Sequence, residues 1–425
     1  MKKRTWALLV AGAAILITAS LLLAAGEITR ANWGAAVGFA TDKNPPGFVA
    51  GETISAANVA KVEKLLPSGI ALLVKKYNLK LITKNYEPFA PSNTFIAATN
   101  KYKGQVKVVD VGNNPRKKGL SNYNAGLPFP APANGLEVAY NYIYSYIGDD
   151  AMNEFGVYWI SGKRGVERSE EWTWDYIAHA MFRTDIAPLP AYPDAQSEDK
   201  QYYSMTVCQK PADKKGFTAM YWRYTEPKDQ DGYIYNPAQR RPIRFSFGTR
   251  GDAWNNTDML YEDVRGFMGY PEWMNWTILN KGTYLAPMNS EIPIGRQFVN
   301  QTYDFKTPPY WNFKGKYEPR AMYVVEAKPK FRDYPYSKMI FYFDAESYLI
   351  LYKEAYDKKG QLWKVQINAW NKSPNPQTSP PDIGTSVIID LQAEHATAMP
   401  WFKSKTNVGL KPAQFTLSNM QKQAR

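Results

Sequence analysis

The chain has 425 residues, of which 15% are aromatic, and a formal net charge of +13 at pH 7. A chain of this length can bury a large core, and so high an aromatic content excludes a disordered protein. Its single cysteine, Cys208, excludes an internal disulfide and a cysteine-based metal site, and two histidines are too few for a metal site built from several histidines.

Residues 1–25 have the layout of a secretory signal peptide. Basic residues open the segment, residues 5–25 carry no charge, and the segment ends in small residues. We therefore predict a leader over residues 1–25, followed by a single exported domain over residues 26–425 in the periplasm. Because about 20 apolar residues can cross a bilayer, an uncleaved inner-membrane anchor formed by residues 5–25 is the alternative.

The excess of basic residues favours anionic partners such as lipid head groups. Export argues against nucleic acid, so we expect no nucleic-acid partner. The bases are dispersed, with the densest runs at 117–118 and 240–241, and this pattern fits an ordinary solvated surface equally well.

Short helices and strands are predicted for the N-terminal part of the chain. One helix begins at Ser55, a good N-cap residue, and a second runs over residues 70–74; both have apolar positions at helical spacing. Residues 93–102 and 104–112 are predicted as strands.

The stretch GLPFPAPANGLEVAYNY, residues 126–142, joins an alternating proline segment to the start of a helix. Proline fixes φ and lacks an N–H, so the first part should be extended and cannot form a central strand. Residues 136–146 place apolar and aromatic side chains on one helical face. The stiff apolar segment must therefore be covered by other parts of the chain or by a ligand.

From residue 155 onward the pattern changes to the alternation typical of strands. Turns of hairpin length separate the last of the aromatic runs before residue 371, which predicts an antiparallel meander there. The predicted strands lie within residues 155–165, 202–210, 216–226, 232–247, 320–328, 337–344, 348–357, 361–370 and 384–392.

Two of these strands differ in their faces. Residues 361–370 alternate apolar and polar side chains from Trp363 onward, which predicts one solvated face. Residues 337–344 are apolar on both sides, with Phe341 and Phe343 on one of them. One face of this strand should pack in the core, and the other needs helices or an apolar ligand to cover it.

Signatures of catalysis are weak. Glu170 and Glu171 beside Trp172 suggest the acid pair of a carbohydrate enzyme, but neighbouring residues point apart on a helix or a strand, and a solvated turn fits better. His179 is interpreted as a packing residue of an apolar helical segment, and Cys208 as a small buried side chain of a strand. We therefore predict no catalytic residue, no metal site and no cofactor.

The stretch at 126–142 resembles the hallmark of a Gram-negative exported family of unassigned function that is often labelled outer-membrane lipoprotein-sorting-like. Its recurring Gly-Leu-Pro-Phe-Pro, Gly-Glu pair and helical Asn correspond here to residues 126–130, Gly135, Glu137 and Asn141, whereas Tyr140 replaces a usual Trp. The resemblance covers residues 50–390. Further blocks follow in the family's order at 239–244, 276–289, 323–328, 336–347 and 356–365.

The resemblance implies a fold like that of the lipoprotein carriers LolA and LolB. Such a fold is mainly β (α+β): a large curved antiparallel sheet, a half-barrel, with an apolar concave face covered by helices. The resemblance also implies two partners, a resistance-nodulation-type inner-membrane transporter and an outer-membrane β-barrel. It supplies no catalytic residue.

We therefore expect a periplasmic carrier that binds lipid or another hydrophobic molecule and passes it between an inner-membrane transporter and an outer-membrane partner. Three arginines are candidates for contact with a head group or partner: Arg240, Arg241 and Arg244. The candidate ligand-binding residues come from the proline segment, the helix after it and the aromatic strands: Pro128, Phe129, Pro130, Glu137, Asn141, Phe341, Phe343 and Trp363.

Two alternatives remain open at this point. A carbohydrate-active or sugar-binding periplasmic protein would account for the many Trp and Tyr residues, and a scaffold that binds no ligand could bridge the same membrane proteins. An integral outer-membrane barrel would account for aromatic strands, but the proline-rich loops, the early helices and the polar C-terminus argue against it.

Overall fold

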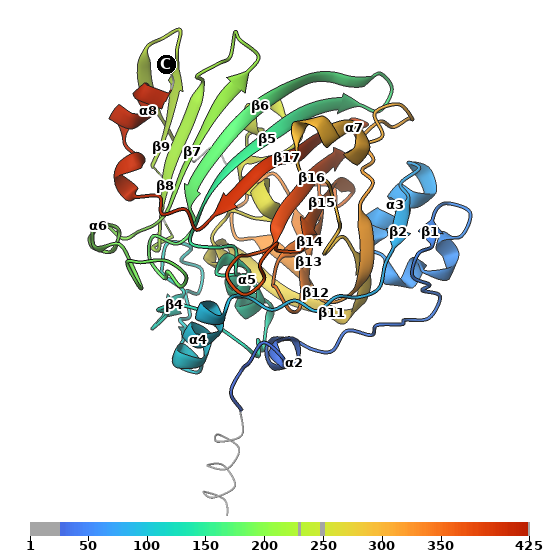
Figure 1. Ribbon diagram of the computed structural model, residues 1–425, viewed down its shortest axis with the longest axis horizontal. Coiled ribbons are helices and arrows are strands. Elements are labelled where there is room, and N and C mark those ends of the chain that lie inside the picture. Colours follow the sequence, from blue (N-terminus) through green and yellow to red (C-terminus); the bar gives the residue numbers. More distant parts are fainter. Residues whose placement is uncertain (1–25, 228–230, 247–250, 424–425) are drawn as a thin grey trace, which may run out of the picture.

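The computed structural model describes residues 26–227, 231–246 and 251–423 (Figure 1). The predicted leader, or alternative anchor, lies outside these ranges. Within them, no helix combines the length and the apolar character needed to span a membrane.

One sheet of 15 strands organises the chain, and it curves without closing into a barrel (Figure 1). Its order is β1-β2-β12-β13-β14-β15-β16-β17-β5-β6-β7-β8-β9-β10, and β11 pairs with β12 beside this path. All described pairs are antiparallel except the short contact between β2 and β12. The predicted fold class, a mainly β half-barrel, is confirmed.

The strands of this sheet are β1 (Thr53–Ile54), β2 (Leu81–Thr83), β5 (Asp150–Ser161), β6 (Gly165–Ile177), β7 (Lys200–Lys210), β8 (Thr218–Tyr224), β9 (Asp231–Asn236), β10 (Arg241–Ser246), β11 (Met274–Ala286), β12 (Lys316–Pro329), β13 (Lys338–Asp344), β14 (Ile350–Tyr356), β15 (Leu362–Asn371), β16 (Asp382–Asp390) and β17 (His395–Thr406). A separate pair consists of β3 (Lys107–Val108) and β4 (Leu120–Ser121). The α-helices are α2 (Trp33–Val37), α3 (Ser68–Lys76), α4 (Asn93–Tyr102), α5 (Gly135–Ile143), α6 (Pro193–Ser197), α7 (Val299–Thr302) and α8 (Leu417–Gln423). Short 3-10 helices are η1 (Val59–Lys61), η2 (Glu63–Leu65), η4 (Trp254–Asn256), η5 (Tyr261–Gly266), η6 (Pro271–Trp273), η7 (Arg296–Phe298) and η8 (Pro412–Gln414).

The segment between β10 and β11 runs through the hollow of the sheet, and we call residues 251–273 the strap. Its ring at Phe267 packs 5.8 Å from Phe341 of β13. On the other side of the hollow, Arg223 of β8 donates to the carbonyl oxygens of Met268 and Gly269. The strap therefore contacts strands on both sides of the hollow. The face of the sheet that the strap contacts is the concave face.

The helices are divided between the two faces of the sheet. Helix α5 covers the concave face, where Tyr142 packs 5.8 Å from Phe343. Helix α3 covers the outer face, where Gly69 lies against Val365 and donates its N–H to Glu354. Helix α5 thus faces the hollow, and helix α3 does not.

Three predictions for the N-terminal part differ from the structure. Residues 93–102 form helix α4, not a strand, because Ser92 caps its first turn and Phe95, Ile96 and Thr99 share one buried face. In residues 104–112 only the two residues of β3 are extended. The helix predicted from Ser55 consists of the two short turns η1 and η2.

Strand β6 also corrects the sequence analysis. It contains Glu170 and Glu171, which were assigned to a solvated turn, and it ends just before His179, which was assigned to a helix. The two glutamates follow strand geometry and point to opposite faces. Glu170 is buried and pairs with Lys214, whereas Glu171 pairs with Arg296.

The solvated face predicted for residues 361–370 does not exist. Lys364, Gln366 and Asn368 are at most 5% exposed, because their side chains face the strap. The amide of Gln366 donates to the backbone oxygen of Asp263 at 2.9 Å, and the Lys364 ammonium donates to the backbone oxygen of Asp258. Lys364 and Gln366 therefore donate their hydrogen bonds to backbone oxygens of the strap instead of to water.

A buried ionic cluster joins β12 to the turn after β13. Arg320 donates through Nε and Nη2 to Asp344 at 2.6 and 3.0 Å, and it also contacts Glu318 and Glu346. Burial raises the pKa of Glu318 to about 8. Glu346 in turn accepts hydrogen bonds from Tyr86 and from the backbone N–H of Phe89 at 2.6 and 2.8 Å, so this cluster fixes the chain that leads to α4.

We expect Arg320→Met to lower the free energy of unfolding by about 3–5 kcal/mol, because it leaves buried carboxylates without their cation. Urea unfolding at pH 7 measures this change. Arg244→Met is the matched control: it removes an exposed pair with Asp231, for which about 0–1 kcal/mol is expected. Equal losses of unfolding free energy in the two variants would contradict the role of Arg320 as the cation that the buried carboxylates require.

Candidate functional site

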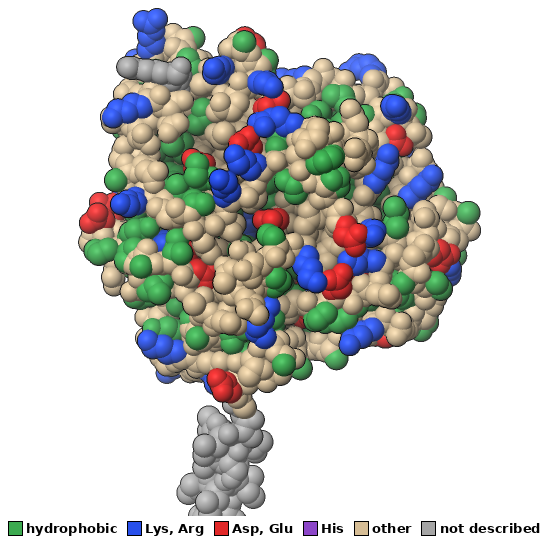
Figure 2. Space-filling view, viewed as in Figure 1, with side chains coloured by type: hydrophobic (Ala, Val, Ile, Leu, Met, Phe, Trp, Pro, Cys, Tyr) green, Lys and Arg blue, Asp and Glu red, His purple; other side chains and the backbone are tan. Residues whose placement is uncertain are grey.

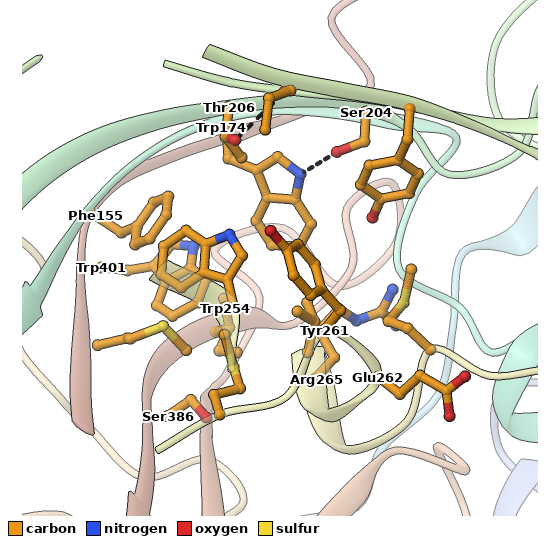
Figure 3. A pocket seen from close by; sticks show the side chains of 17 residues that line it. Phe155, Trp174, Ser204, Thr206, Trp254, Tyr261, Glu262, Arg265, Ser386 and Trp401 are labelled. Carbon is orange, nitrogen blue, oxygen red and sulfur yellow. Dashed lines mark hydrogen bonds between the residues drawn. The ribbon is translucent and has the colours of Figure 1, made fainter. Parts of the chain in front are cut away.

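A cavity lies between the concave face and the strap (Figure 3). Its empty volume is about 880 Å³, a figure that includes space open to solvent. The wall comes from strands β5–β8, β16 and β17 on one side and from the strap on the other. The residues of the wall are Phe155, Trp174, Ser204, Thr206, Ala219, Tyr221, Trp254, Met259, Tyr261, Glu262, Val264, Arg265, Met268, Ile383, Ser386, Met399 and Trp401.

Aromatic rings form most of the apolar wall. Phe155 of β5 stacks on Trp401 of β17 at 5.5 Å and lies 6.4 Å from Trp174 of β6. The indole N–H of Trp174 donates to Ser204 at 2.9 Å, as Figure 3 shows, so this large side chain is held in one orientation without an unpaired polar group. Methionines from the strap and from β17 add adaptable apolar surface.

Strand periodicity explains why these side chains meet. On β6, Trp172 and Trp174 are separated by one residue and face the hollow together, whereas Glu171, just before Trp172, faces outward. Trp172 then packs 5.4 Å from Trp254 of the strap. The same alternation repeats along the neighbouring strands, so residues far apart in sequence line one surface.

The middle of the strap is held by a buried ion pair. Asp263 lies against the Lys353 ammonium of β14, accepts from Tyr336 at 2.7 Å, and accepts the backbone N–H of Leu260 at 2.8 Å. Both charged side chains are at most 1% exposed. The concave face was predicted to be apolar, and this part of it is polar because the strap is attached there.

The first part of the strap is held by a second polar group. Thr397 of β17 donates to Asp258 and accepts its backbone N–H, at 2.7 and 2.9 Å. His395 Nδ1 lies 2.7 Å from the same carboxylate, and its Nε2 lies 3.5 Å from Glu167. These two carboxylates raise the pKa of His395, the bond to Asp258 being the largest cause.

Arg265 projects from the strap at a tight turn. Val264 has φ −54° and ψ 127°, and Arg265 has φ 56° and ψ 14°, which is close to a type II turn with arginine where glycine is favoured. A side chain in this left-handed region costs about 1–2 kcal/mol. Tyr142 stabilises the turn by donating to the Arg265 carbonyl at 3.0 Å.

Two smaller cavities also have Arg265 in their walls, with volumes of about 440 and 360 Å³ that include solvent-open space. His179 lines the first, and burial and the nearby charge of Arg265 lower its pKa to about 3. Tyr176 lines the second; burial raises the pKa of this tyrosine, while Arg265 opposes the shift. Arg265 therefore stands where three cavities adjoin, with the neutral side chains of His179 and Tyr176 in two of the walls.

The candidate residues of the proline segment lie outside these cavities. Asn141 of α5 accepts from the backbone N–H of Phe129 and donates to its carbonyl, at 2.9 and 2.7 Å, so it clamps the segment against the helix. Glu137 closes the first turn of α5 by accepting the N–H of Ala133. Pro128 is buried, and Phe129 and Pro130 are partly buried.

Nor do the candidate strand residues line the cavities. Phe341 and Phe343 are fully buried and pack against Phe267 of the strap and Tyr142 of α5. Trp363 donates its indole N–H to Asp390 at 2.7 Å.

The candidate arginines Arg240, Arg241 and Arg244 lie at the exposed β9–β10 hairpin, at one end of the sheet. Figure 2 shows basic side chains scattered over the face in view and mixed with acidic ones.

The sequence analysis did not identify the strap. No repeat or periodicity marks residues 251–273, although their density of aromatic and methionine residues was visible. Strand β17 was also missed, because Pro400 and the polar residues around it obscure the alternation.

Residues 53–421 match the model of a family described as "Protein of unknown function (DUF1329)". The chain belongs to this family. The suspected membership in a family of unassigned function, predicted from the motif at 126–142, is therefore confirmed. A curated relative, the uncharacterized protein PA3922 of Pseudomonas aeruginosa, is 24% identical over 325 residues, which cover 74% of this chain and 68% of that protein.

Two solved structures resemble this DUF1329 chain. One is a proposed outer membrane lipoprotein-sorting protein domain from Vibrio parahaemolyticus, with 16% identity and a TM-score of 0.48 over 68% of this chain and 98% of the other. The second is a DUF1329 family protein from Desulfovibrio piger, with 17% identity and a TM-score of 0.47 over 67% and 97%. The family description itself names no activity.

We expect the strap to loosen as pH rises from 6 to 8.5. A histidine whose folded pKa is raised contributes stability that is complete below its unfolded pKa of ~6.5 and is lost as pH rises through the folded value. Amide hydrogen exchange of residues 254–260, corrected for the intrinsic effect of pH, measures the loosening.

His395→Gln is the matched variant, because glutamine keeps a polar side chain that does not titrate. His179 needs no separate variant, since its pKa of about 3 keeps it neutral throughout. A pH dependence that persists in His395→Gln would assign the effect to other groups.

Proposed function

We propose that this DUF1329 protein is a non-enzymatic periplasmic carrier that holds a lipid or another hydrophobic molecule in the cavity under the strap. The observation that carries this proposal is the cavity itself: about 880 Å³ walled by aromatic rings and methionines inside a half-open sheet. Burial of apolar surface stabilises a bound molecule by about 25 cal/mol per Å². A chain of several CH2 groups, each worth ~0.8 kcal/mol, would therefore be retained.

The strap suits a carrier because it covers the cavity without belonging to the sheet. It is attached at Asp258, Asp263, Met268 and Gly269, among other points, by bonds from individual side chains, whereas the sheet is held by continuous ladders. Movement of the strap would open the cavity and leave the strands intact.

The route of transfer extends the proposal. We infer that residues 1–25 direct export as a leader, that residues 26–425 act as one domain, and that a resistance-nodulation-type inner-membrane transporter and an outer-membrane β-barrel exchange cargo with it. The support is the motif at 126–142 and the excess of basic residues. The exposed arginines at 240, 241 and 244 are candidates for contact with head groups or with these partners.

A carbohydrate enzyme is less well supported. The acid pair that it would need was sought at Glu170 and Glu171, and these side chains lie on opposite faces of β6 in separate ion pairs. Retaining and inverting enzymes both need two carboxylates that face one substrate.

We expect protein released from the periplasm by osmotic shock to carry an apolar molecule in near-stoichiometric amount. Mass spectrometry of an organic extract identifies it, with an unrelated periplasmic protein of similar size as control. An extract no richer than that of the control would contradict the carrier.

We expect Ala219→Phe to displace this molecule, because the added ring enters the cavity from β8. Overpacking of ~1–3 kcal/mol corresponds to a ~5- to 100-fold loss of affinity. Val166→Phe adds the same ring at an exposed position of β6 and should retain the ligand. Retention of ligand by both variants, with unchanged unfolding temperatures, would place the ligand elsewhere.

A further inference from the structure

We propose that the cavity takes an amphiphile with an anionic head group, a carboxylate or a phosphate, and that Arg265 binds this head group while the aromatic wall holds the apolar part. The inference rests on the proposed function and specifies its ligand. It depends on a separate observation, a buried guanidinium nitrogen without a hydrogen-bond partner.

Arg265 is a cation without a counter-ion. Its Nε is buried without a hydrogen-bond partner, and no carboxylate in the described ranges forms an ion pair with its guanidinium. Buried and partly buried charges in proteins are normally paired, because desolvation of an isolated charge is costly. An anion in the cavity would supply the missing partner.

The acidic groups close to Arg265 in sequence are engaged elsewhere. Asp263 is held by Lys353 and Tyr336. Glu262 accepts from Tyr334 at 2.6 Å, and in Figure 3 its carboxylate points away from the rings of Phe155 and Trp174. The positive charge at the cavity wall is therefore not neutralised by the strap itself.

The surroundings of Arg265 suit a head group more than a water-filled pocket. Tyr176, Tyr202 and Tyr221 remain neutral, because burial raises the pKa of each, and the charge of Arg265 acts against that shift in all three. His179 is neutral as well. A guanidinium among neutral aromatic groups is a strong and selective site for a planar or tetrahedral anion.

The backbone at this position supports the assignment. Arg265 adopts φ 56° in a turn where glycine would be free of strain. A long, charged side chain at such a position, directed into a cavity, is an outlier of the kind that concentrates at ligand sites.

The proposal is tested by competition with a neutral fluorescent probe, N-phenyl-1-naphthylamine, on delipidated full-length protein. The competitors are dodecanoate, dodecyl phosphate and methyl dodecanoate, which share one chain length and differ in head group. We expect the wild-type protein to bind at least one anion roughly tenfold or more tightly than the ester. The tighter of the two anions then distinguishes a carboxylate from a phosphate head group.

Three variants test whether Arg265 causes the preference for the anionic competitors. Arg265→Met should abolish the preference for the anion and leave the affinity for methyl dodecanoate unchanged. Arg265→Lys should keep most of the preference, since it keeps the charge. Arg116→Met, which removes an exposed arginine outside the proposed site, should behave as the wild type.

The outcomes separate this inference from the carrier itself. Equal binding of all three competitors by the wild type, or a preference that survives in Arg265→Met, would overturn the role of Arg265 while the carrier stands. Failure of both the probe and every competitor to bind would overturn the proposed function. Unfolding temperatures within a few degrees of the wild type are required of each variant, and Arg265→Lys provides the second test if Arg265→Met does not fold.

Discussion

The buried ion pair between Asp263 and Lys353 is the contact on which the interior of this protein depends. Each charge is excluded from water, so each requires the other, and the pair ties the middle of the strap to the centre of the concave face. Around this point, Gln366 and Tyr336 add hydrogen bonds to the same strap residue. The strap therefore has a fixed depth in the hollow, and the space left beside it becomes the cavity.

The attachment divides the concave face into two unequal parts. On the side of β12–β14, Phe267 and Tyr142 fill the hollow against Phe341 and Phe343, and this part is core. On the side of β5–β8, the strap contributes side chains that stand apart from the sheet, and the large rings of Trp174 and Trp401 face them across the cavity. The packed core and the cavity thus share the same face and the same covering segment.

Strand alternation lets one sheet support two covers. Lys353 and Glu354 are neighbours on β14, yet the first binds the strap and the second binds the first turn of α3. Lys353 and Glu354 each have a partner on their own face of the sheet, so neither side chain is left alone in an apolar environment. Within the described strap, the buried Nε of Arg265 has no hydrogen-bond partner, and the turn that carries it is strained.

The sequence by itself determined the local structure and the family. Period-two alternation predicted the meander of β13–β15, helical spacing predicted α5 and α3, and the block at 126–142 identified the family, because each of these signals lies within a few consecutive residues. Which side chains form a site was decided by tertiary structure. Phe341 and Lys364 have the sequence pattern of a ligand wall and a solvated face, and both are buried against the strap, a segment about a hundred residues away that has no periodicity of its own. A local pattern reveals that a face needs a cover, but the identity of the cover depends on contacts distant in sequence, and these contacts placed Arg265 in the wall of the cavity.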